Sequence, residues 1–133
     1  MGKLLGLFLL LSQLWLHAGA IRWRGDYNAA HREALEKGHP LLVLLIREKC
    51  TACRDLVLRL AVDTEISSWI NRSTVPVIVR ADERSDYPVE LYYTTRFPTL
   101  FWTDSRRELP LRPPCFGADS CFDALKRWQR ENP

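Results

Sequence analysis

The sequence predicts an α/β domain whose central mixed sheet carries helices on both faces. Short apolar runs alternate along the chain with segments whose apolar residues recur at helical spacing, and the last two runs are close enough to pair as a hairpin. The expected order of elements is β-α-β-α-β-α-β-β-α. Strands that alternate with helices favour parallel pairing, and a closing hairpin adds antiparallel pairing.

The first expected elements are a short strand over residues 21–24 and a helix over residues 27–37. Asp26 is a suitable N-cap for this helix, and Gly38 is expected to end it. The unbroken apolar run at residues 41–46 then predicts a strand that is buried on both faces, as in a parallel or mixed sheet.

The remaining elements follow the same alternation of apolar runs and helical spacing. They are, in order, a helix over residues 51–61, a helical segment over 64–70 capped by Asp63 or Thr64, a strand over 75–79, a short helix over 89–94, a strand over 99–102, a weaker strand over 108–112 and a last helix capped by Asp119. The last two strands of this series form the expected hairpin.

The first twenty residues are expected to be a signal peptide that is not part of the folded domain. Lys3 supplies a positive charge, residues 4–16 are largely apolar, and residues 18–20 read Ala-Gly-Ala, which is a cleavage signal. An uncleaved anchor is the alternative, although the apolar stretch is shorter than the ~20 residues that a spanning helix needs. Cleavage would leave residues 21–133 as one exported domain without a membrane span, in a periplasm or a secretory route.

Charge and cysteine content narrow the class of protein further. The formal net charge is +3, and basic and acidic residues are interspersed, so no nucleic-acid partner is expected. All four cysteines follow the signal peptide, and in an oxidising compartment an even number is usually paired. Proximity suggests the pairs Cys50–Cys53 and Cys115–Cys121, although four cysteines permit three pairings.

The motif Cys50-Thr51-Ala52-Cys53 carries the functional prediction. Its two-residue gap lets two thiols join as a disulfide, or separate as a dithiol, with little backbone movement. At a helix N-terminus the positive end of the dipole, with Lys49 and Arg54 nearby, favours the thiolate of Cys50. A bridge across so short a loop removes little chain entropy, so stability alone is a poor reason for it. We therefore expect thiol–disulfide chemistry, with an inert bridge or a metal site as alternatives.

The order of elements, the C-x-x-C after the buried strand and Phe97-Pro98-Thr99 before the next strand resemble the thioredoxin family. The resemblance covers residues 23–128 and includes Gly117, close to the last helix, and the pattern Ala34-x-x-x-Gly38-x-Pro40 before the buried strand. A lone C-x-x-C is a weak signal. A C-x-x-C followed about 45 residues later by Pro-Thr is a specific one.

This resemblance implies a thioredoxin-like fold and a role for each residue of the site. Cys50 would be the exposed nucleophile that attacks a protein disulfide, and the more buried Cys53 would resolve the mixed disulfide. Pro98 would follow a cis peptide bond, and the backbone of Phe97 would face Cys50 and pair with an extended substrate segment. No cofactor or metal is expected. The partners would be a protein disulfide or dithiol and a membrane or periplasmic redox protein.

Several positions depart from the pattern of the family. Lys49 replaces a common Trp, Leu44 occupies the position of a buried acid, and Thr51-Ala52 matches neither the Gly-Pro of general reductases nor the Pro-His of strong oxidants. Reduction is slightly favoured, because the dipeptide lacks a His that would strongly stabilise the thiolate. Glu48 is a candidate proton acceptor in place of the missing acid, and a solvated loop carboxylate is the alternative.

The second cysteine pair, Cys115 and Cys121, is expected to be a structural disulfide that holds the last helix to the hairpin. A second redox pair that relays electrons from Cys53 is the alternative. A zinc site built from all four cysteines is less favoured, because C-x5-C is not a common zinc half-site. Two rival functions remain at this stage: a non-catalytic binding module with structural disulfides, and metal delivery through the C-x-x-C.

Overall fold

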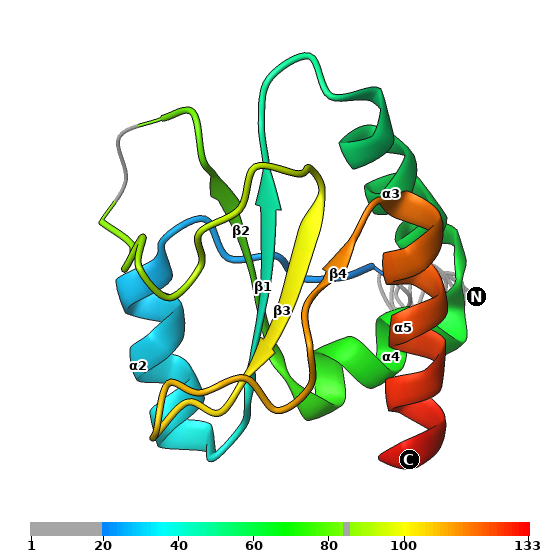
Figure 1. Cartoon of the computed structure of the whole chain (residues 1–133). Coiled ribbons are helices and arrows are strands. Elements are labelled where there is room, and N and C mark those ends of the chain that lie inside the picture. Colours follow the sequence, from blue (N-terminus) through cyan, green and yellow to red (C-terminus); the bar gives the residue numbers. More distant parts are fainter. Residues whose placement is uncertain (1–19, 84–85) are drawn as a thin grey trace, which may run out of the picture.

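The computed structural model of the chain describes residues 20–83 and 86–133 (Figure 1). The expected signal peptide therefore lies outside the described residues, except for Ala20. Within the described ranges, no helix combines the length and apolar character needed to cross a membrane.

A four-stranded mixed sheet forms the centre of the fold, with the strand order β2-β1-β3-β4. The strands are β1 (Leu41–Ile46), β2 (Val75–Arg80), β3 (Thr99–Thr103) and β4 (Cys115–Phe116). β1 pairs in parallel with β2 and antiparallel with β3, and β4 pairs antiparallel with β3. Five of the six residues of β1 are buried, so the prediction of a strand covered on both faces is confirmed.

Helices cover both faces of this sheet, as the sequence predicted. Helix α2 (Tyr27–Lys37) lies on one face, and α3 (Thr51–Val62), α4 (Thr64–Ser73) and α5 (Ala118–Glu131) lie on the other (Figure 1). The fold class is therefore the expected α/β class.

The two faces of β1 enter two separate hydrophobic cores, because neighbouring residues of a strand point to opposite sides. Leu42 and Leu44 belong to the core that α3, α4 and α5 complete. Leu41, Val43 and Leu45 belong to the core that α2 covers. β1 is thus packed on both of its faces, and this packing fixes the position of its C-terminal end.

Local capping signals explain where most helices begin and end. The carboxylate of Asp26 accepts a hydrogen bond from the backbone of Ala29, and Gly38 ends α2 in the left-handed conformation (φ 67°). The Asp63 carboxylate caps α4 through the backbone N–H of Ile66. The expected cap at Asp119 is wrong: Gly117 is the N-cap of α5, and no side chain caps this helix.

The expected first strand over residues 21–24 is reduced to a single bridge between Arg24 and Val77. Arg24 exchanges two backbone hydrogen bonds with β2, but the N–H of Arg22 donates to the Asn71 side chain instead. The neighbouring residues Ile21 and Trp23 pack against the core beside α3, α4 and α5, so the ladder does not extend.

Two further expectations are wrong. Residues 89–94 form turns rather than a helix, because buried Tyr92 packs against Phe101 and hydrogen-bonds to the Tyr27 hydroxyl, and this anchoring replaces helical pairing. Residues 108–112 form only one bridge, between Thr103 and Pro110. Prolines cannot donate a backbone hydrogen bond, and the actual hairpin partner, β4, begins only after the two prolines at 113–114.

Glu33 of α2 links this helix to the segment before it, and we expect its loss to weaken the fold. Hydrogen bonds from Arg24, and next from Lys37, lower the pKa of Glu33 to about 2. Because the pKa is lowered on folding, this stabilisation is present above the unfolded-state pKa of about 4.3 and disappears as the pH falls towards 2.

We predict that Glu33→Gln lowers the free energy of unfolding by about 1 kcal/mol at neutral pH, and by almost nothing near pH 2. Urea unfolding at several pH values measures this difference. Glu36→Gln is the matched control, since Glu36 is exposed on the same helix and has no ion pair among the described residues. Equal losses in both variants would contradict the prediction.

Candidate active site

The C-x-x-C begins in the loop that connects β1 to α3 and continues into the first turn of α3. β1 ends at Ile46, an exposed loop follows, and Lys49 takes a left-handed backbone conformation (φ 52°) before the helix begins. Cys50 is the N-cap of α3, with an extended backbone, and its Sγ accepts a hydrogen bond from the Cys53 N–H at 3.1 Å. The expected position at a helix N-terminus is therefore confirmed.

Cys50 and Cys53 are joined as a disulfide, with their Cα atoms 5.2 Å apart. Cys50 is partly exposed, whereas only 4% of Cys53 is exposed. This inequality gives an incoming sulfur access to Cys50 and shields Cys53. After reduction, the Cys53 N–H and the positive end of α3 would both stabilise a thiolate at Cys50. The catalytic roles of the two residues remain predictions.

Phe97 and Pro98 lie at the same end of the sheet as the C-x-x-C loop, near the C-terminal end of β1. Thr99, the next residue, is opposite Leu45 near the end of β1. The guanidinium of Arg47, three residues before Cys50, lies 5.3 Å from the centroid of the Phe97 ring. Segments almost fifty residues apart in the sequence are therefore brought together here.

The backbone around Pro98 is held in place on one side and left open on the other. The Phe97–Pro98 peptide bond is cis, and the Pro98 carbonyl accepts a hydrogen bond from Gly117 at 2.9 Å. The Thr99 hydroxyl bonds to that of Thr94 at 2.8 Å. Among the described residues, the N–H and C=O of Phe97 have no hydrogen-bond partner. Free backbone groups of this kind can pair with an extended peptide segment through backbone hydrogen bonds.

No carboxylate occupies the position that the family resemblance assigned to a buried acid. Leu44 is fully buried and shares a core with Leu56 and Leu60 of α3. Glu48 lies on the exposed loop, and its backbone N–H donates to the Asp82 carboxylate at 3.0 Å. If Cys53 acts as the expected resolving thiol, its proton would pass to water or to an exposed group.

We expect Glu48→Gln to slow the resolving step by less than about threefold, because water and buffer can replace an exposed carboxylate. A dedicated general base usually contributes at least about a hundredfold. Rapid-quench measurement of the decay of the mixed disulfide, across a range of pH, gives the rate of this step. A hundredfold lower rate of this step in Glu48→Gln than in the wild-type protein would identify Glu48 as the proton acceptor.

The second cysteine pair forms a bridge away from solvent. Cys115 of β4 and Cys121 of α5 are joined with Cα atoms 5.1 Å apart, and their exposed fractions are 7% and 0%. Between them, Gly117 adopts φ 88°, a conformation that other residues rarely take. The bridge fastens α5 to the edge strand of the sheet, and its burial leaves no open face for a partner thiol.

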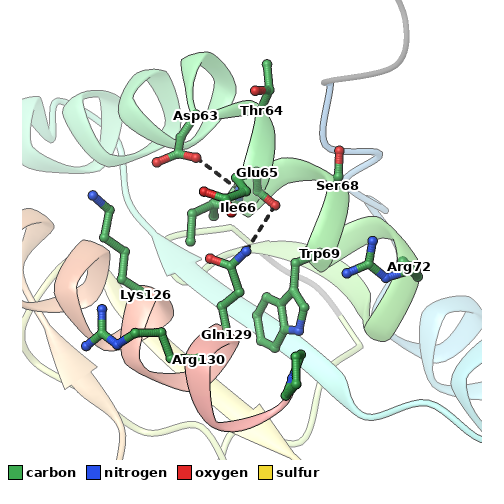
Figure 2. Close-up of a pocket in the computed structure, with 11 residues that line it drawn as sticks. Asp63, Thr64, Glu65, Ile66, Ser68, Trp69, Arg72, Lys126, Gln129 and Arg130 are labelled. Carbon is green, nitrogen blue, oxygen red and sulfur yellow. Dashed lines mark hydrogen bonds between the residues drawn. The ribbon is translucent and has the colours of Figure 1, made fainter.

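The C-x-x-C region is distinct from the large groove between α4 and α5. That groove has a volume of about 870 Å³, and Figure 2 shows its polar lining, including Asp63, Arg72, Lys126 and Arg130 around Trp69. Gln129 crosses it and donates to the Glu65 carbonyl. Within residues 20–83 and 86–133, no three Cys, His, Asp or Glu side chains gather closely enough to hold a metal ion.

No protein-family model and no curated protein sequence matches the chain. Solved structures do match it. A structure described as the DsbH oxidoreductase has a TM-score of 0.63 and 16% identity, and covers 84% of this chain and 86% of its own. A thioredoxin from Thermus thermophilus has a TM-score of 0.68 and 19% identity over the same shares. A poplar thioredoxin h has a TM-score of 0.59 and 19% identity, over 80% of this chain and 89% of its own.

Fold and site together define a class: an α/β protein with a C-x-x-C disulfide at the start of a helix that follows a central strand. The particular fold is the thioredoxin fold.

Proposed function

We propose that this protein is a thiol–disulfide oxidoreductase that acts on protein disulfides through Cys50 and Cys53. One observation carries the proposal: a partly exposed Cys50 caps a helix and is bridged to a buried Cys53, in a thioredoxin fold. The free backbone groups of Phe97, beside Pro98, support it because they can align a substrate segment next to the bridge.

In the reducing direction, the Cys50 thiolate attacks one sulfur of a substrate disulfide. The substrate S–S bond breaks, a Cys50–substrate disulfide forms, and the other substrate sulfur leaves as a thiolate. Cys53 then loses its proton and attacks Sγ of Cys50, which releases the second substrate sulfur. Two electrons pass from the protein to the substrate, and the Cys50–Cys53 disulfide remains. Oxidation follows the same steps in reverse.

The direction in the cell, the compartment and the redox partner belong to the proposal. Reduction is slightly favoured, since Thr51-Ala52 contains no His to stabilise the thiolate. Export to a periplasm or along a secretory route fits the apolar N-terminal segment and the two disulfides. A membrane or periplasmic redox protein would then return electrons to Cys50 and Cys53. The likeness in fold to the DsbH oxidoreductase supports the proposal of thiol–disulfide exchange.

The reduction potential of the Cys50–Cys53 pair distinguishes a working redox site from an inert bridge. We expect a potential between about −300 and −120 mV, the range that thioredoxin-type oxidoreductases and their relatives occupy. Equilibration in thiol buffers of known potential, read by alkylation and mass spectrometry, measures it. A value well below about −300 mV would identify a structural bridge and would leave only the binding-module function.

A further inference from the structure

Four exposed cations lie in the two segments that carry the C-x-x-C and Pro98: Arg47, Lys49, Arg54 and Arg96. None of them has a carboxylate within 4.0 Å among the described residues, and no acidic residue lies outside those ranges. Elsewhere, Arg59 is paired with Asp119 and Arg112 with Glu131, whereas the exposed Arg106 and Arg107 have no carboxylate within 4.0 Å among the described residues. The positive charge at the site is therefore free to meet an external partner.

Two of these cations lie over aromatic rings close to Pro98. Arg47 lies over Phe97 at 5.3 Å, and Arg96 lies over Phe116 at 5.4 Å from the ring centroid. Phe116 is opposite Thr99 in the sheet, so both arginine–aromatic contacts lie at the end of the sheet where Pro98 is found. Stacking limits the motion of a guanidinium while leaving its N–H groups free to bind a carboxylate.

Nearby carboxylates only partly offset this charge. Glu48 and Asp82 are the acidic residues placed beside the loop, and Asp82 already accepts the Glu48 N–H. Asp55 of α3 lies 3.7 Å from Arg59 and is directed to that pair. Arg59 is nearer to Asp119 than to Asp55, and even with Asp55 counted the four cations outnumber the three nearby carboxylates.

We propose that the site selects disulfides whose flanking residues are acidic. This inference rests on the proposed function and names its substrate class: an extended segment pairs with the backbone of Phe97, and carboxylates on that segment bind Arg47 and Arg96. Electrostatic attraction of this kind raises the rate of encounter and specifies the partner more than it raises affinity. The electron transfer is the two-step exchange described above, with dithiothreitol as the external reductant in the assay.

Two cyclic peptides with the same internal disulfide test this preference, one flanked by glutamates and the other by lysines. We expect the protein with reduced Cys50 and Cys53 to reduce the acidic peptide about tenfold faster at low salt. The ratio should fall to about twofold in about 0.5 M salt, because screening then acts within a few ångströms. Stopped-flow fluorescence of the peptides measures both rates.

Matched double variants separate local charge from total charge. Arg47→Gln with Arg96→Gln should reduce the ratio below about threefold at low salt. Arg106→Gln with Arg107→Gln should leave the ratio of the two rates unchanged. These exposed arginines lie in the turn after β3, at the opposite end of the sheet from Pro98. Equal rates for both peptides, or equal losses in both double variants, would overturn the acidic preference alone. Failure to reduce either peptide would overturn the proposed function as well.

Discussion

Replacement of Cys50 by Ala is expected to reduce disulfide exchange by more than about a thousandfold while the domain stays folded. Cys50 is partly exposed and caps α3, whereas Cys53 is buried, so no other described thiol can take over the attack. The measurement is the rate of insulin disulfide reduction at a fixed dithiothreitol concentration, with far-ultraviolet circular dichroism to verify the fold.

Cys53→Ala provides the contrast for this experiment. It should preserve the single attack by Cys50 and leave resolution of the mixed disulfide to added dithiothreitol, so turnover becomes dependent on the dithiothreitol concentration. If Cys50→Ala retains more than a tenth of the wild-type rate, the nucleophile has been assigned wrongly.

The second large effect concerns stability. Cys115→Ala combined with Cys121→Ala is expected to lower the free energy of unfolding by about 2–4 kcal/mol and the melting temperature by about 10 °C. The bridge fixes the start of α5 to β4, and both cysteines are buried in the core that Leu125 and Trp128 also enter. Thermal and urea unfolding measure the loss.

The same variant decides between a structural bridge and a second redox pair. A structural bridge predicts an unchanged rate of exchange per folded molecule at Cys50. A relay predicts the reverse pattern, in which turnover is lost while stability is kept. Since Cys115 and Cys121 are almost inaccessible, we expect the first result.

Elements that depend on local patterns were predictable from the sequence. The run of six apolar residues in β1, the Asp26 and Asp63 caps and the terminating Gly38 are each specified by neighbouring residues. The position of Cys50 at the start of α3 follows from the same kind of local signal.

Elements that depend on distant contacts were not predictable. Tyr92 prevents a helix at residues 89–94 by packing on Phe101, which follows it by nine residues, and on Tyr27, which precedes it by sixty-five. The hairpin partner of β3 shifts to β4 because prolines interrupt residues 108–114. Asp119 faces Arg59 across the helices instead of capping α5.

The candidate site shows the same division. The C-x-x-C, its pairing and the exposure of Cys50 could be expected from spacing and from the family resemblance. The stacking of Arg47 on Phe97 and of Arg96 on Phe116 could not, because each joins segments that only the sheet brings together. Nothing in the sequence around Arg47 or Arg96 indicates that these cations lack a carboxylate partner.

Cys50 is proposed to be the attacking sulfur of a redox-active pair. The most direct measurement is mass spectrometry of Cys53→Ala, reduced and then mixed with a disulfide-bonded peptide. We expect one peptide attached per protein molecule, located at Cys50, and released by dithiothreitol. Absence of the adduct from a folded protein whose Cys50 thiol still reacts with iodoacetamide, or attachment at Cys115 or Cys121 instead, would contradict the claim.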